Sequence, residues 1–217
     1  MKAARCYRGR VPTGLRERRK HEARQAISRA AMALFAARGF DEVTISQVAE
    51  AAGVSKMTVT NYFPRKEDLV FDRAEAITGS LAAAAAARAH GESLLTAVRR
   101  DYAERIGAGD VTLGPPTAAF ARMVAGSHVL VSRYRELAEL SEQALGDVIA
   151  AEAGTDDPQH RIVAAQLASV YRVLFAESTA RVLAGQRPDE IRQLLAAAAA
   201  SAFDLLEPSL GTYGIKT

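Results

Sequence analysis

The sequence predicts an all-α protein of about nine helices, in which a short N-terminal group of three helices precedes a larger helical region. Apolar residues recur at helical spacing in almost every segment that Gly and Pro separate, and few runs alternate as a strand requires. Pro115, Pro158 and Pro188 lie where helices are expected to begin, which suits the fixed φ of proline. With 217 residues, of which 49 % are hydrophobic and 24 % charged, the chain can bury a core as one or two domains.

Each helix is predicted from its own apolar pattern and its flanking residues. The first carries Ile27 and Ala31 on one stripe and is closed by Gly39, and the fourth carries Ile77 and Leu81 at the same spacing. Gly or Pro lies between most of the remaining segments. The predicted helices span residues 15–38, 44–52, 55–63, 66–91, 92–106, 116–125, 132–153, 158–183 and 188–206.

The last two helices are apolar over most of their circumference. One apolar face of each can pack inward, but the other needs a partner, and in a water-exposed protein a second copy of the chain is a frequent partner. The alternative is a pair of central core helices in a monomer. The apolar pattern alone does not distinguish the dimer from the monomer.

Charge is distributed unevenly. Residues 1–70 hold 14 Lys and Arg against 7 Asp and Glu, and residues 71–217 are net negative, although the whole chain carries only +3. A basic region followed by an acidic one suggests a module for a polyanion and then a module with another task. A solvated basic tail is the alternative interpretation.

Several classes of protein are excluded or disfavoured. No segment approaches the roughly 20 apolar residues that span a bilayer, and the basic N-terminus lacks the features of a secretory signal, so we expect a cytoplasmic protein without membrane contact. Cys6 is the only cysteine, which excludes an internal disulfide. Because His21, His90, His128 and His160 show no metal-ligand spacing, we expect neither a metal nor another cofactor.

The most informative segment is VTISQVAEAAGVSKMTVTNYFPRKEDL, residues 43–69. Thr44 and Gln47 form a capping box that starts one helix. Gly53 supplies a permissive C-cap, and Ser55 caps a second helix. Two short helices joined by a Gly-containing turn of about three residues are typical of the helix-turn-helix, whose second helix enters the major groove of DNA.

The predicted helix pair has an apolar and a polar face. The apolar residues expected to face inward are Ile45, Val48, Ala49, Ala52, Val54, Val59 and Phe63. The residues expected to face outward on the second helix are Lys56, Met57, Thr58, Thr60, Asn61 and Tyr62. Such donors, together with a methyl-bearing group and an aromatic hydroxyl, read bases and hold phosphates. A solvated polar face is the alternative, but the caps, the turn and the basic arm all agree with DNA binding.

Residues 15–70 resemble the N-terminal domain of the tetracycline-repressor (TetR) family of bacterial regulators. The resemblance rests on AISRAAMALFAARGFDEVT, on ISQVAEAAGVS and on TVTNYFPRKEDL, with its Tyr-Phe pair followed by Lys-Glu. It implies a basic arm at residues 1–14, a DNA-binding domain at 15–65 and a ligand-binding and dimerisation domain at 66–217. It implies phosphate contacts by Thr44, Thr58, Tyr62 and Lys66, with Lys66 at the N-terminus of the fourth helix, and base contacts by Lys56, Met57, Thr60 and Asn61.

The resemblance also implies a small-molecule effector and a homodimer through the helices at 158–183 and 188–206. The expected function is therefore a repressor that a small, mainly apolar effector releases from a palindromic operator in double-stranded DNA. Candidate pocket residues are Leu94, Tyr102, Phe120, Met123, His128, Tyr134, Tyr171 and Phe175, whose polar tips could orient an apolar molecule. The alternative for each of them is an ordinary place in the core.

The sequence departs from the family pattern at three places in the DNA-binding region. Met57 stands where a small residue is frequent, Thr60 where an aromatic residue is frequent, and Arg65 where a small helix cap is usual. The operator sequence therefore does not transfer from the family. The arm, with Lys2, Arg5, Arg8 and Arg10, is expected either to follow DNA or to be a frayed tail.

Two other classes of function remain as alternatives. A sequence-nonspecific DNA-binding or scaffold protein without an effector would bind every DNA sequence equally. An all-helical enzyme could hold acid and base groups on facing helices. The sequence contains no Gly-rich phosphate loop, no HExxH and no nucleophile elbow, so we expect no enzymatic activity.

Overall fold

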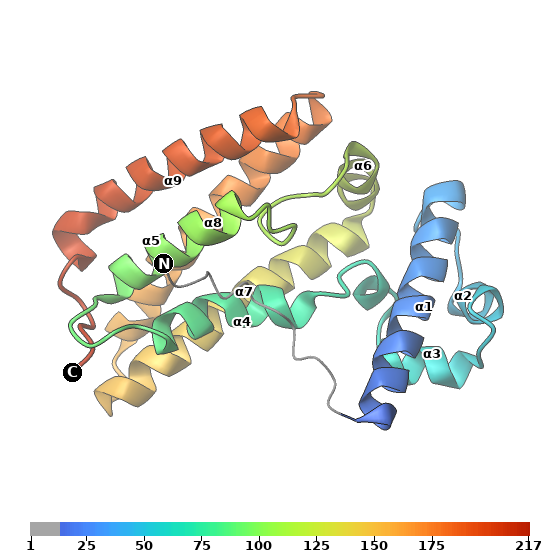
Figure 1. The fold of residues 1–217 in the computed structure, drawn as a ribbon, viewed down its shortest axis with the longest axis horizontal. Helices are drawn as coiled ribbons and strands as arrows, with labels where there is room; N and C mark the ends of the chain where they lie inside the picture. The colour runs from blue at the N-terminus through green and yellow to red at the C-terminus, as the bar shows by residue number, and fades with distance from the viewer. Residues whose placement is uncertain (1–13) are drawn as a thin grey trace. The chain divides into compact units, whose positions relative to one another are not determined.

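Residues 14–217 are described by a computed structural model (Figure 1). These residues contain α-helices, one short 3₁₀ helix and no strand, in agreement with the predicted all-α class. The elements are α1 (Leu15–Arg38), α2 (Ile45–Ala51), α3 (Lys56–Tyr62), η1 (Lys66–Leu69), α4 (Ala74–Ala86), α5 (Leu94–Gly107), α6 (Ala118–Gly126), α7 (His128–Ala153), α8 (Pro158–Leu183) and α9 (Pro188–Leu210).

The chain forms two compact units that divide between Asp72 and Arg73. In the first unit, η1 packs against α1. The Asp72 carboxylate accepts a hydrogen bond from Ser28 Oγ at 3.0 Å, and its carbonyl accepts one from Arg24 at 3.1 Å. These contacts with α1 attach residues 66–72 to the first unit, whereas the sequence analysis placed the boundary after residue 65.

The core of the first unit is formed by all of its helices. Ile27 and Phe35 of α1 are buried, as are Val48 of α2 and Val59 of α3. Apolar residues at these spacings must be removed from water to offset the entropy of ordering such short helices. The core therefore fixes α2 and α3 against α1.

The second unit is a bundle of longer helices. Its packing neighbours are α4 with α7, α7 with α8, α8 with α9, and α9 with α5, and Figure 1 shows α9 running beside α8 and α5. One buried apolar cluster extends through the unit and includes Leu95 and Val98 of α5, Leu167 of α8 and Phe203 of α9. Within the described residues, no helix is long and apolar enough to cross a membrane.

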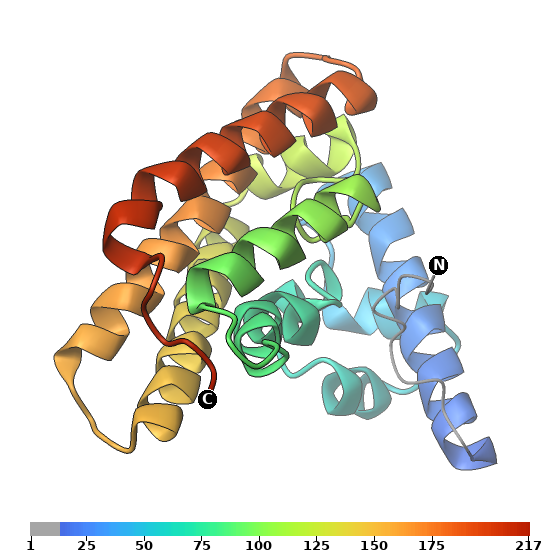
Figure 2. The ribbon, with the colours of Figure 1, turned by 60° about the vertical axis from the view of Figure 1, so that its left-hand side comes forward.

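The segment after α9 folds back along the second unit (Figure 2). The backbone of Lys216 pairs with Gly91 and Glu92, at 2.8 and 3.1 Å, and the Tyr213 carbonyl accepts a hydrogen bond from Leu94 N. The Tyr213 hydroxyl is also 2.8 Å from His160 Nδ1. The C-terminal segment thereby joins the α4–α5 loop to the start of α8.

The predicted fourth helix was wrong at both ends. Residues 66–69 form the 3₁₀ helix η1, and α4 begins only at Ala74. The Asp68 carboxylate accepts a hydrogen bond from the Arg65 backbone N–H at 3.1 Å, which stabilises a short turn with its own cap. At the other end, α4 stops at Ala86, and Ser93 caps α5 by accepting a hydrogen bond from Thr96 N at 3.2 Å.

Three other predicted boundaries also differ. Helix α6 begins at Ala118, capped by Thr117, rather than at residue 116 directly after Pro115. Helix α7 begins at His128 rather than Ser132, and its N-cap residue Ser127, although of a favoured type, makes no side-chain capping bond to the helix. Helix α9 runs through Pro208 to Leu210 rather than ending at Leu206. A proline this close to a helix end removes one backbone hydrogen bond without disrupting the preceding turns.

Candidate DNA-binding face and effector cavity

Helices α2 and α3 are joined by a tight, capped turn. The Thr44 hydroxyl accepts a hydrogen bond from Gln47 N at 3.3 Å, and Gln47 Oε1 accepts one from Thr44 N at 2.9 Å, which confirms the capping box. Ser55 Oγ accepts a hydrogen bond from Thr58 N at 3.0 Å and caps α3. Between the helices, Gly53 has φ of +66°, a left-handed conformation that glycine adopts without a Cβ clash. The helix-turn-helix prediction is confirmed.

The two faces of α3 differ as the sequence indicates. Val59 on α3 and Phe63 directly after it are buried, together with Val48 and Ala49 of α2. Three other residues that the sequence predicts to face inward, Ile45, Ala52 and Val54, are half-buried. Of the other residues of α3, Lys56, Met57 and Asn61 are exposed and Thr58, Thr60 and Tyr62 are half-buried. The structure thus brings six of the eight candidate DNA-binding residues together on one short helix.

Arg24 of α1 positions the end of α3, a role that the sequence analysis missed. Its guanidinium donates to the Tyr62 carbonyl at 2.9 Å and to the Asp72 carbonyl at 3.1 Å, and it lies 4.4 Å from the centre of the Phe63 ring. The three contacts join α1 to the residues on both sides of η1. No local sequence signal reveals this role, because the partners lie 38 and 48 residues away.

The two candidate phosphate contacts outside α3, Thr44 and Lys66, both have hydrogen-bond partners within the protein. Lys66 Nζ donates to the Asp41 carbonyl at 3.3 Å and lies 4.3 Å from the centre of the Phe40 ring. Burial lowers the pKa of this ammonium, and the charges of Asp41, Glu67 and Glu42 partly oppose the shift. Lys66 lies at the start of η1 rather than of α4, which corrects the expected helix-dipole site. A phosphate contact by Lys66 therefore stays a prediction, and it depends on the charge of the ammonium without help from the dipole of α4.

Lys2, Arg5, Arg8 and Arg10 lie outside the described residues. Their expected role along DNA stays a prediction.

A small cavity lies within the second unit, between α4, α5, α7 and α8. Its volume is about 50 Å³, and its lining includes Arg105, Thr112, Tyr134, Tyr171 and Phe175. Tyr134 and Phe175 stack face to face, with their ring centres 4.2 Å apart. Three of the eight candidate pocket residues therefore converge on this cavity.

One side of the cavity is formed by Arg105, whose charge is paired with carboxylates of the protein. Arg105 donates to Asp110 at 2.9 Å and to Asp101 at 3.2 Å, and the Tyr171 hydroxyl donates to Asp101 at 3.2 Å. Burial disfavours the charge on Arg105, but the hydrogen bond to Asp110 and the charge of Asp101 outweigh it and raise the pKa of the guanidinium. Burial also raises the pKa of Tyr171 and of Tyr134, so both phenols stay protonated and can donate hydrogen bonds.

The other candidate pocket residues lie elsewhere. Tyr102 is buried edge-on against Tyr171, with ring centres 5.0 Å apart, and burial raises its pKa to about 12. Tyr102 lines a separate groove between α5 and α9. Leu94 is buried in the core, Phe120 and Met123 are half-buried on α6, and His128 is exposed at the start of α7.

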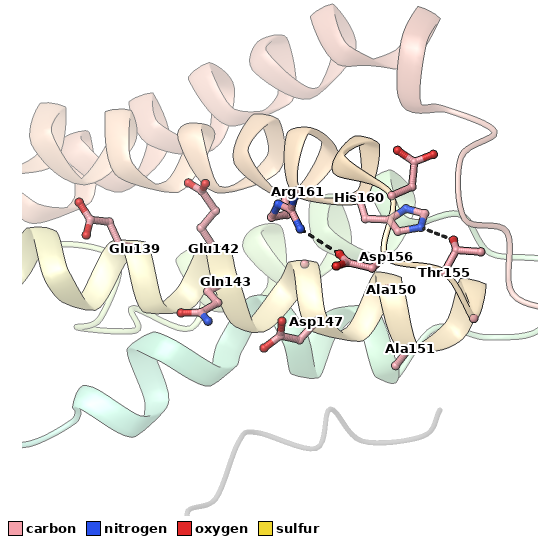
Figure 3. A pocket seen from close by; sticks show the side chains of 13 residues that line it. Glu139, Glu142, Gln143, Asp147, Ala150, Ala151, Thr155, Asp156, His160 and Arg161 are labelled. Carbon is pink, nitrogen blue, oxygen red and sulfur yellow. Dashed lines mark hydrogen bonds and ion pairs between the residues drawn. The ribbon is translucent and has the colours of Figure 1, made fainter.

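A groove of about 830 Å³ runs between α7 and α8 and is strongly acidic (Figure 3). Glu139, Glu142 and Asp147 extend from α7 along it, and Arg161 of α8 pairs with Asp156 at 2.9 Å. Carboxylates repel phosphates and are costly to cover with an apolar molecule. This groove therefore suits neither DNA nor an apolar effector.

A capped helix-turn-helix with a polar outward face, on a chain whose second unit holds a separate cavity, defines the class of DNA-binding regulators. Residues 27–72 match the pattern of bacterial regulatory proteins of the tetR family. The HTH-type transcriptional regulator TcmR of Streptomyces glaucescens is 31 % identical over 205 residues, which cover 91 % of this chain and 88 % of TcmR. The protein belongs to the TetR family of transcriptional regulators, as the resemblance implied, and this is a family of DNA-binding regulators rather than enzymes.

Solved structures show the same fold at lower identity. GusR of Salmonella enterica has a TM-score of 0.53 and 16 % identity, covering 94 % of this chain and 100 % of its own. A structure assigned to TetR-family regulators from Syntrophomonas wolfei has a TM-score of 0.54 and 14 % identity, covering 85 % and 96 % of the two chains. The two-unit helical architecture is therefore shared with this family.

Proposed function

We propose that this protein is a repressor that binds a palindromic operator as a homodimer and is released by a small, mainly apolar effector. The observation that carries the proposal is the outward face of α3, where Lys56, Met57 and Asn61 are exposed on a helix capped by Ser55. Donors and apolar groups on one short exposed helix suit the edges of base pairs in the major groove.

The proposed homodimer forms through α8 and α9, because both expose large apolar side chains. Ile162 and Val173 lie on α8, and Leu194 and Leu205 on α9. The members of each pair are separated by about three helical turns, so they share one face of their helix. Covering these faces with a second copy removes apolar surface from water.

The proposed effector enters the cavity beside Tyr134, Tyr171 and Phe175. At about 50 Å³ the cavity has room for only a few water molecules, whereas pockets for small organic ligands measure roughly 300 Å³ or more. An effector must therefore widen the cavity, whose lining includes the stacked rings of Tyr134 and Phe175. Ile77 and Leu81 of α4 also line the cavity, and α4 is the helix that follows the first unit in the chain.

Selection of bound fragments from random DNA tests the proposal. We expect enrichment of a palindrome whose half-sites are about 34 to 36 Å apart or a multiple of this distance. Sedimentation at micromolar concentration should give a dimer. If all DNA sequences bind equally, the protein is a nonspecific DNA-binding protein and the repressor proposal fails.

A second experiment tests the effector. A molecule that weakens operator binding must itself be bound less tightly by the operator complex, by the same factor. Any compound that binds should be measured with and without operator DNA. Equal affinity in both states would contradict release by the effector.

A further inference from the structure

Met57 is the first of two residues that give α3 an apolar reading surface. Its side chain is 68 % exposed, on the outward face of a helix whose other side is buried. A single exposed apolar residue is common on protein surfaces and needs no explanation by itself. Its meaning here depends on the neighbouring Thr60.

The hydroxyl of Thr60 is already engaged. Thr60 Oγ1 donates to the carbonyls of Met57 and Lys56, at 3.1 and 3.3 Å. A hydroxyl has one hydrogen, so Thr60 has no donor left for a base edge. Because the oxygen turns back towards the preceding turn of the helix, the γ-methyl occupies a different staggered position. The structure thus leaves two groups of Thr60 for contact with DNA, the γ-methyl and a hydroxyl oxygen that can only accept.

Met57 and Thr60 are three residues apart in α3, so their side chains are neighbours on one face. Lys56 and Asn61, which are exposed on the same helix, supply polar groups around them. Among the base edges in the major groove, only thymine presents an apolar group, the C5-methyl. Charged and amide side chains do not recognise that group, whereas methyl and thioether groups pack against it.

We infer that Met57 and Thr60 read thymine C5-methyl groups in the operator, which makes them specificity-determining residues for methyl contact rather than hydrogen bonding. The inference rests on the proposed operator binding by α3. It changes the sequence-based expectation for Thr60, whose hydroxyl was a candidate for base contact.

Replacement of thymine by deoxyuridine tests the inference, because it removes the C5-methyl and keeps every hydrogen-bonding group. In an operator obtained by selection, each thymine is replaced in turn and the dissociation constant of the full-length dimer is measured. We expect a loss of about three- to fivefold at one or two positions in each half-site, the size expected for one buried methyl.

Matched variants assign the sensitive positions. Met57→Ala should bind thymine and deoxyuridine equally at one position. Thr60→Ser, which keeps the hydroxyl and loses the methyl, should do the same at a second position. Thr60→Val, which keeps the methyl and loses the hydroxyl, should keep the wild-type preference for thymine. Thermal melting and binding to scrambled DNA at low salt verify that each variant is folded.

Two results would overturn the inference while leaving the proposed repressor function intact. One is equal affinity for the operator after deoxyuridine replacement at every thymine. The other is wild-type binding by Thr60→Ser together with weakened binding by Thr60→Val, which would show that the hydroxyl makes the contact. Failure to select any operator would instead remove the proposed function, and the methyl inference with it.

Discussion

The helix pair α2–α3 of the first unit and the cavity of the second unit depend on contacts of different range along the chain. In the first unit, helix ends are fixed by residues three positions apart, as in Thr44 with Gln47 and Ser55 with Thr58. The second unit also has such caps, as in Ser93 with Thr96, but polar contacts in it further join segments far apart in the chain, as in Tyr171 with Asp101 and His160 with Tyr213. The comparison teaches that the candidate DNA-binding face is specified mainly by local sequence, whereas the candidate effector cavity depends on long-range packing.

The largest expected effect separates the core of the second unit from its proposed dimer surface. Leu195 is 1 % exposed, whereas Leu205 on the same helix is 81 % exposed. Leu195→Asp should lower the free energy of unfolding by several kcal/mol, because it buries a charge without a partner. Leu205→Asp should leave the protomer folded and weaken the dimer. Chemical denaturation and sedimentation of both variants distinguish the two effects. A dimeric Leu205→Asp protein would contradict the proposed interface.

Arg24→Ala tests whether the first unit also depends on long-range contacts, because Arg24 bonds to residues far along the chain. It removes two hydrogen bonds to carbonyls and the contact with Phe63. Because Arg24 is half-buried, we expect a loss of about 2 kcal/mol in the stability of the first unit. Arg24→Lys should recover only part of it, since an ammonium cannot hold both carbonyls with a planar fork. Unchanged melting of Arg24→Ala would show that local caps alone position α3.

The helix caps should have smaller and similar effects. Thr44→Ala and Ser55→Ala each remove a side-chain acceptor for a backbone N–H, and each should lower the stability by about 1 kcal/mol. The controls Thr44→Ser and Ser55→Thr retain the hydroxyl and should restore most of it. The measurement is urea denaturation followed by circular dichroism. Full stability of both alanine variants would mean that core packing, rather than capping, determines these helices.

The smallest expected effect is on DNA binding by Lys66. Lys66→Ala should weaken binding to all sequences and reduce the slope of log affinity against log salt by about one unit, as for one lost phosphate contact. Loss of its contacts with Asp41 and Phe40 should cost little stability, because the side chain is only partly buried. A changed base preference with an unchanged salt slope would contradict the phosphate role.

The sequence by itself determined the all-α class, the position of the helix-turn-helix and the outward residues of α3. These features depend on caps, on Gly53 and on apolar spacing, which act over a few residues. The same local signals failed at α7, whose start at His128 has no side-chain cap. They also failed after η1, where the helical run stops at Leu69 and Asp72 is held against α1 by Arg24 and Ser28 before α4 begins.

Only the tertiary structure decided which candidate side chains meet and which groups stay available for contact. Tyr134, Tyr171 and Phe175 converge on one cavity because α7 packs against α8, whereas Leu94 is enclosed in the core. The availability of a group can also depend on geometry within one helix, as the engaged hydroxyl of Thr60 shows. Helical periodicity gives the direction of each side chain from its own axis, but not the partner that it meets there.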